Sequence, residues 1–180
     1  MKILAIDPSL SLTGAALIKV RGNKLEILDT DFVSRDEIDW YDQCQKIVKQ
    51  LEEVYKGVAF DTLAIEEPIF SWGRRNPQGF FKQSVLVGML LNSALITIPD
   101  FSSTAELKNI ALINPKTMKL VFTKDGKAKK DAIIEKARHW YSFPETRKVQ
   151  REAIADAIGI GYTFWRFAQR PQNFKGVTLI

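Results

Sequence analysis

The chain has 180 residues, of which 46% are hydrophobic and 26% charged, and its formal net charge is +5 at pH 7. This composition excludes a disordered or fibrous protein. The length suits one domain of residues 1–180 whose core needs no disulfide or structural metal. Cys44 is the single cysteine, so no disulfide can form within the chain, which suits a reducing cytoplasm.

The apolar stretches are too short for a signal peptide or a membrane span. The N-terminal run meets Asp7 almost at once, and the most apolar stretch, residues 85–98, is interrupted by Asn92 and Ser93. We therefore expect a cytoplasmic protein in which residues 85–98 belong to a buried helix.

Charge is divided unevenly along the chain. Residues 1–69 hold 8 Lys and Arg against 13 Asp and Glu, whereas residues 70–180 hold 18 against 8. Phosphate binding needs concentrated positive potential, so the basic part favours a nucleic-acid partner without establishing one.

Hydrophobic periodicity predicts a mixed order of strands and helices. The first part predicts strands at residues 3–6, 12–20 and 24–33, a helix at 37–55 capped by Asp36 or a neighbour, and a strand at 62–65. The second part predicts a loop at 70–79, a helix at 80–96, a strand at 110–113, a helix begun by Asn114 and Pro115, a basic turn at 123–130, helices at 129–140 and 148–169, and a frayed or extended end. This order predicts an α/β fold, a mixed five-stranded sheet with helices on both faces.

Asp7 and Glu66 each stand at the C-terminal end of a predicted strand. If these strands are parallel neighbours, the two carboxylates meet at one edge of the sheet, where ligand sites commonly form. Glu67 should then point to the other side of its strand. The alternatives are an ordinary turn at Asp7-Pro8 and a solvated strand end at Glu66.

Two further acids, Glu152 and Asp156, are four residues apart and share one face of the last helix beside small and apolar residues. Arg151 or Lys148 could instead balance them on a wet surface. Four clustered carboxylates would repel one another without a cation, and their hard oxygens suit Mg²⁺ or Mn²⁺. Two such ions can activate water and stabilise the leaving oxygen in phosphodiester hydrolysis.

His139 is the single histidine, and we expect a structural or surface role for it. A zinc site and a histidine-based hydrolase are therefore not expected.

Four segments carry a family resemblance: ILAIDPSLSLTGAALI, LAIEEPIF, NPKTMKLVFTKDGKAKKDAI and EAIADAIGIGY. In this order they resemble the motifs of the RuvC-type Holliday-junction resolvases, over residues 1 to about 167. The resemblance implies an RNase H-like fold, a homodimer, two divalent metals per site and symmetric nicking of four-way DNA junctions. It suits a protein of a bacterial cell or a phage-infected host.

Carried over by position, Asp7, Glu66 and Asp156 match the family's metal-binding acids. The family's fourth acid lies three residues before the last one, where this chain has Ala153. We expect Glu152, one residue earlier and on nearly the same face, to replace it.

The resemblance also assigns the basic segment to DNA. Lys119 and Lys130 align with the family's functional lysines, which implies that they neutralise phosphates or hold the scissile strand, with Lys119 in the catalytic set. Lys116 and Lys127 are further expected DNA contacts. The alternative for each lysine is a solvated helix face.

The loop after Glu66 is where the family contacts the junction. We expect Arg74 and Arg75 to bind DNA there, and Phe70 or Trp72 to insert beside an unstacked base. Both aromatic side chains could equally cover the edge of the core.

The predicted helix at residues 80–96 is apolar nearly all round, so it is expected to be buried on more than one side. It could pack on a partner subunit, because a four-way junction has two symmetric strands to cut and suits two related active sites. It could equally be a central core helix.

Nothing in the sequence recognisably reads base edges, so we expect structure-selective cutting of junctions and other branched DNA with weak or no sequence preference. The main alternative, favoured by Ala153, is a non-catalytic protein that binds branched DNA. An RNA–DNA hybrid nuclease fits the basic segment less well. An ATPase of the sugar-kinase type needs two such domains and glycine-rich phosphate loops, which the chain lacks.

Overall fold

The computed structural model describes residues 1–37, 39–69, 77–97, 107–173 and 175–180. Within them, six strands form one sheet in the order β3-β2-β1-β4-β5-β6. Their bounds are β1 Lys2–Asp7, β2 Leu12–Arg21, β3 Lys24–Ser34, β4 Thr62–Glu66, β5 Asn109–Ile113 and β6 Val177–Leu179. β1, β4 and β5 are parallel, while β2, β3 and β6 each run antiparallel to their neighbours. The predicted α/β fold with a mixed sheet is confirmed.

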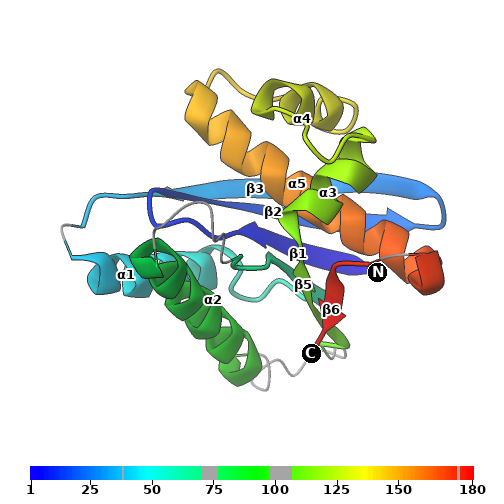
Figure 1. Ribbon diagram of the computed structural model, residues 1–180. Helices are drawn as coiled ribbons and strands as arrows, with labels where there is room; N and C mark the ends of the chain where they lie inside the picture. Colours follow the sequence, from blue (N-terminus) through cyan, green and yellow to red (C-terminus); the bar gives the residue numbers. More distant parts are fainter. Residues whose placement is uncertain (38, 70–76, 98–106, 174) are drawn as a thin grey trace.

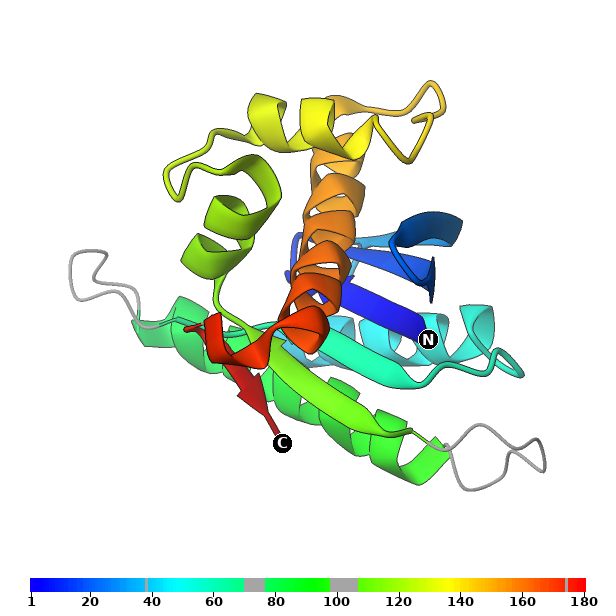
Figure 2. The same ribbon diagram turned by 90° about the vertical axis from the view of Figure 1, so that its right-hand side faces the viewer.

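Helices cover both faces of the sheet (Figure 1). One face carries α1 (Trp40–Val54) and α2 (Pro77–Thr97), and α5 (Lys148–Gln169) crosses the other. The shorter α3 (Pro115–Thr123) and α4 (Lys130–Ala137) pack on α5 on that second side, as the turned view in Figure 2 also shows. None of the helices in the described ranges is long and apolar enough to cross a membrane.

Side-chain alternation along β1 produces two separate core layers. Ile3 and Ala5 pack in the layer beneath α5, whereas Leu4 and Ile6 pack in the layer against α1 and α2. Successive residues of a strand point to opposite faces, so Asp7 lies on the α5 side.

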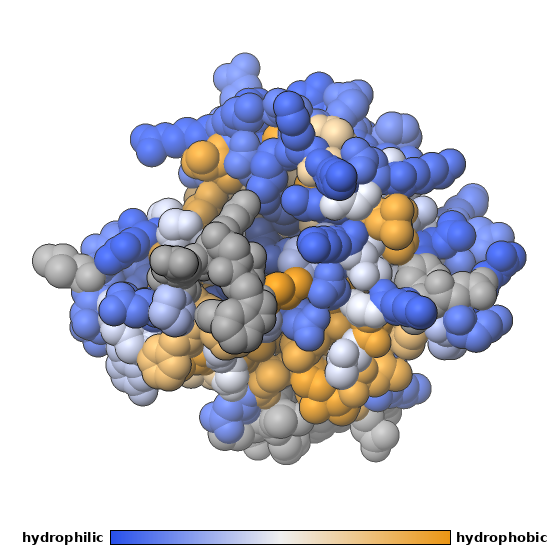
Figure 3. Space-filling view, in the orientation of Figure 1, coloured by the Kyte–Doolittle hydropathy of each residue, from blue (hydrophilic) through white to orange (hydrophobic). Residues whose placement is uncertain are grey.

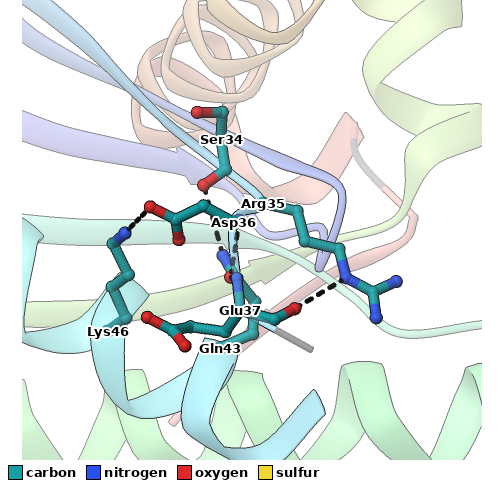
Figure 4. Close-up of polar contacts among 6 residues, drawn as sticks. All are labelled: Ser34, Arg35, Asp36, Glu37, Gln43 and Lys46. Atoms are coloured by element: carbon teal, nitrogen blue, oxygen red, sulfur yellow. Dashed lines mark hydrogen bonds and ion pairs between the residues drawn. The ribbon is translucent and has the colours of Figure 1, made fainter. Parts of the chain in front are cut away.

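The connection from β3 to α1 is fixed by a buried glutamine (Figure 4). The Gln43 amide oxygen accepts hydrogen bonds from the backbone N–H groups of Asp36 and Glu37, and its amide nitrogen donates to the carbonyl of Ser34 at 3.4 Å. Asp36 therefore does not cap the helix, and its carboxylate pairs with Lys46 instead.

The N-cap of α1 is Asp39, which accepts from the backbone N–H groups at the first turn, so the helix begins at Trp40 rather than near residue 37. The cap is thus Asp39, three residues after the Asp36 that the prediction named.

Other boundaries also differ from the prediction. α2 begins at Pro77, three residues before the predicted start of this helix at residue 80. The end of the chain forms a sixth strand, β6, on the edge of the sheet, after a turn at Gly176 with φ +81° whose carbonyl accepts from Asn114 N–H. α4 stops at Ala137, before the predicted end at Trp140. The chain turns after Ala137, and the Trp140 ring packs on Phe122 and Tyr162.

Candidate active site

The sheet brings Asp7 and Glu66 together at one edge. β1 and β4 are parallel and paired as far as Ile6 with Ile65, so the next residues of the two strands, Asp7 and Glu66, are neighbours. Ala64, two residues before Glu66, lies in the core layer beneath α5, as Ala5 does. Both acids therefore project toward α5, as the strand-end argument predicts.

The third acid comes from α5. Asp156 is 2% exposed, although aspartate is rarely buried without a partner. Its depth depends on how closely α5 approaches the sheet at Gly14, which is paired with Asp7. A Cβ at Gly14 would lie 2.2 Å from the carbonyl oxygen of Ala153, so only glycine fits this contact.

The three acids interact electrostatically. Burial, followed by repulsion from Glu66 and Asp156, raises the pKa of Asp7 well above its ordinary value. Burial and repulsion from Asp156 raise the pKa of Glu66 to about 7. Burial also raises the pKa of Asp156, and the positive charge of Lys130 opposes this rise. Such mutual perturbation between residues far apart in the sequence is typical of functional sites.

Two lysines face the acids from the outer helices. Lys130, the first residue of α4, forms an ion pair and hydrogen bond with the Oδ2 atom of Asp156. Lys119 on α3 lies near enough for its charge to lower the pKa values of Glu66 and Asp156. These are the two lysines that the sequence singles out.

The donor set suits a hard divalent cation. Three carboxylates on one side of the sheet supply oxygen ligands, and Asp156 Oδ1 is buried without a hydrogen-bond partner in the described part of the chain. No three Asp, Glu, His or Cys side chains of the described residues are close enough to hold one ion together as they stand. The Lys130 ammonium is the cation that contacts Asp156 in this arrangement.

Glu152 lies at the margin of this cluster. It is half-buried on α5, one turn before Asp156, and its charge contributes to the raised pKa of Asp156. It also faces Lys148, which pairs with Asp131. The position that aligns with the family's fourth acid is taken by the buried Ala153, which packs against Gly14.

The other residues that the sequence singles out lie outside this cluster of acids or outside the described part of the chain. Lys116, in the first turn of α3, and Lys127, in the turn before α4, are both exposed. Hydrophilic side chains dominate this part of the surface (Figure 3). Glu67 accepts a hydrogen bond from the Asn114 side chain. His139 is exposed beside Trp140, which confirms its surface role. Phe70, Trp72, Arg74 and Arg75 lie outside the described residues.

A contact that the sequence does not predict ties α2 to the loop after Asp7. The side-chain amide of Gln83 donates to the carbonyl of Pro8 at 3.2 Å. The loop is closed further by Thr13, whose hydroxyl accepts from Ser9 N–H and donates to the Ser9 carbonyl. In the sequence, only Gly14, in the Thr-Gly pair of the first motif, indicates that another segment packs closely against this part of the chain.

The chain resembles known proteins over nearly its whole length. The sequence profile described as crossover junction endodeoxyribonuclease RuvC matches residues 3–164. The crossover junction endodeoxyribonuclease RuvC of Helicobacter pylori strain G27 is 25% identical over 163 residues, covering 91% of this chain and 95% of that protein. The protein of the same name from Geotalea uraniireducens is 26% identical over 162 residues, covering 89% and 85%.

Solved structures agree with the fold. Thermus thermophilus RuvC superposes with a TM-score of 0.73 at 19% identity, covering 100% of both chains. T. thermophilus RuvC in complex with a Holliday junction substrate gives a TM-score of 0.71 at 18% identity, covering 94% of this chain and 96% of that one. The profile match over most of the sequence, on a chain whose acids meet at the sheet edge, shows that this chain belongs to the RuvC family of crossover junction endodeoxyribonucleases.

Proposed function

We propose that this chain is a metal-dependent endonuclease that cuts four-way DNA junctions, and other branched DNA, by phosphodiester hydrolysis. The observation that carries the proposal is the meeting of Asp7, Glu66 and Asp156 beneath Lys119 and Lys130 in a member of the RuvC family. The names of the relatives, and the structure of one relative with a Holliday junction substrate, support the choice of substrate.

The three acids, with Glu152 as a fourth, would hold the metal, which we propose to be two Mg²⁺ or Mn²⁺ ions per site. When bound, these ions supply an activated water and charge stabilisation for the leaving oxygen. The carboxylates of this chain fix where that chemistry occurs, because two of them project from strand ends and the third from a helix packed on glycine. Burial of Asp156 keeps bulk water away from one side of the cluster.

The lysines would bind the DNA backbone around the cut. Between residues 115 and 130 the chain has six lysines and one acid, Asp125. Lys119, in the catalytic set, and Lys130 lie closest to the acids and would neutralise the scissile phosphate. Lys116 and Lys127 are exposed further along the same surface and would bind flanking phosphates. Phosphate contacts position DNA without reading its sequence, so we propose weak sequence preference.

Residues of the predicted loop after Glu66, which lie outside the described part of the chain, would add to the proposed DNA surface. These residues are Phe70, Trp72, Arg74 and Arg75, of which the arginines would hold phosphates and an aromatic ring would stack on an unpaired base at the branch.

A homodimer would supply two sites for the two strands. α2 is the proposed contact, because its buried side, with Leu86, Val87 and Leu90, covers the sheet while Phe81 stands 58% exposed on the other side. An isologous helix contact relates two sites by a two-fold axis, which matches the symmetry of a four-way junction. The bacterial relatives support a place of action in the cytoplasm of a bacterial or phage-infected cell.

The proposal is tested by incubating the protein with four-way, forked and linear DNA of matched sequence, each strand labelled in turn, in Mg²⁺, Mn²⁺ or chelator. We expect metal-dependent nicks in two opposing strands of the junction and little cutting of linear duplex. Equal cutting of linear duplex, or an intact junction in both metals, would refute it.

A second candidate, a non-catalytic binder of branched DNA, is favoured by Ala153 at the position of the fourth acid. Replacing Glu152 by Ala separates the two functions. Loss of cutting with retained junction binding supports the nuclease and the role of Glu152. An uncut junction that binds the unaltered protein tightly in the presence of metal would support the binder.

A further inference from the structure

Lys130 reaches into the acidic cluster from a position near solvent. It begins α4, and its side chain is 49% exposed, whereas the side chain of its partner Asp156 is 3% exposed. The ammonium contacts one carboxylate oxygen, Oδ2, and leaves Oδ1 without a partner. The contact therefore joins a fixed, buried acid to the end of a flexible, accessible side chain.

The charge of Lys130 acts on all three acids and not on Asp156 alone. The positive charge lowers the pKa values of Asp7 and Glu66, and the acids in turn raise the pKa of Lys130. The ammonium thus lies within the field of the cluster, where a cation that binds the same carboxylates would also lie. Lys119 adds a second positive charge near Glu66 and Asp156, so two lysines stand against the three carboxylates.

A divalent cation and the ammonium would compete for this place. Both require the Asp156 carboxylate, and like charges a few ångströms apart in a buried site repel strongly. Lys130 can move away at little cost, because half of its surface already faces solvent and lysine has a long flexible stem. Moving outward, it would join the exposed Lys127 and Lys129 on the basic surface.

We propose that the Lys130 ammonium occupies the acidic cluster of the metal-free chain, and that divalent-metal binding releases it to bind a DNA phosphate. This inference rests on the proposed function, because it takes the same acids as metal ligands. It makes metal binding and junction binding positively coupled through one side chain, and by linkage each raises the affinity for the other.

Calorimetric titration with MgCl₂ in the absence of DNA tests the first half. Lys130→Met removes the competing cation, so we expect its Mg²⁺ affinity to rise by about fivefold or more, the lower range of common coupling effects. Lys129→Met, at the exposed adjacent residue, is the matched control and should keep the affinity of the unaltered protein. Unchanged or weaker Mg²⁺ binding by the Lys130 variant would overturn the inference.

Thermal unfolding measures the loss of the Lys130 contact separately from Mg²⁺ affinity, and it also shows whether the variants are folded. In chelator, Lys130→Met should melt at a lower temperature than Lys129→Met, because the acids lose their only contacting cation among the described side chains, and MgCl₂ should remove the difference. Lys130→Gln retains a hydrogen-bond donor for Asp156 without the charge, and should show the same gain in Mg²⁺ affinity. A gain in the Met variant alone would contradict a charge effect.

Gel-shift titration of a four-way junction tests the second half. With Ca²⁺ in place of chelator, the unaltered protein and the Lys129 variant should bind more tightly, and Lys130→Met should lose most of this gain. An equal gain in all three proteins would overturn the release step.

The junction-cutting assay keeps this inference separate from the proposed function. Unchanged Mg²⁺ affinity in Lys130→Met, together with junction cutting by the unaltered protein, would refute only the exchange. Tighter Mg²⁺ binding by this variant, in a protein that never cuts junctions, would support the exchange and refute the nuclease.

Discussion

Replacing Glu66 by glutamine should stabilise the metal-free protein while it removes a proposed metal ligand. The pKa of Glu66 is raised from 4.5 to about 7 by burial and by repulsion from Asp156. An acid with a higher pKa in the folded chain holds its proton more tightly there. Folding therefore loses stability as the pH rises from about 4.5 to about 7. At 1.36 kcal/mol per pKa unit, the full cost above that range is about 3 kcal/mol.

Glutamine is neutral at every pH, so Glu66→Gln should avoid this cost. In chelator at about pH 8, we expect the free energy of unfolding in urea to exceed that of the unaltered protein by up to about 3 kcal/mol. At about pH 4 the advantage should vanish, because the acid is protonated in both states. Adding MgCl₂ should reverse the order, because the bound ion stabilises the protein that has the carboxylate.

Glu67→Gln is the matched control, since it makes the same change one residue away and keeps an acceptor for Asn114. It should change stability by less than about 0.5 kcal/mol. A Glu66 variant that is no more stable than the unaltered protein at pH 8 would refute the reasoning. So would an advantage of equal size at pH 4.

Three further changes test separate parts of the account. Gly14→Ala should lower the free energy of unfolding by about 3 kcal/mol or more, because its Cβ would lie 2.2 Å from the Ala153 oxygen. In the control Gly88→Ala, the added Cβ meets nothing within 4 Å, so the free energy of unfolding in urea should change by no more than about 1 kcal/mol. Equal losses of stability in the two variants would contradict the packing argument. Asp7→Asn should slow junction cutting by more than about 100-fold, which exceeds the usual effect of changing a residue that only supports a metal ligand. Its affinity for the junction in chelator, measured by gel shift, should be at least that of the unaltered protein. Cutting near the unaltered rate would exclude Asp7 as a ligand. Lys119→Gln should reduce the salt slope of junction binding by about one, and an unchanged slope would remove Lys119 from the phosphate contacts.

The acids that the sequence identifies are those whose position follows from local rules. Asp7 and Glu66 end apolar strands, and parallel strands bring their ends to one edge, so their meeting follows once β1 and β4 are paired. The helix containing Asp156 is equally clear from its periodicity and small residues, and the predicted bounds at residues 148–169 are those of α5.

The features that the sequence misses depend on contacts between distant segments. The ion pair of Lys130 with Asp156 joins residues that are 26 positions apart in the sequence, and the sequence predicts only DNA binding for Lys130. The hydrogen bond from Gln83 to Pro8 joins residues 75 apart and has no periodic signal. β6 has three residues, and its pairing with β5 defines it as a strand more than its own composition does.

The proposed binding of metal by Asp7, Glu66 and Asp156 is tested most directly by diffraction from crystals grown with Mn²⁺, using the anomalous signal of the ion. We expect Mn²⁺ in contact with the carboxylates of Asp7, Glu66 and Asp156, with the Lys130 ammonium withdrawn from Asp156. Mn²⁺ bound only elsewhere, with Lys130 still paired to Asp156 at saturating metal, would contradict this proposal.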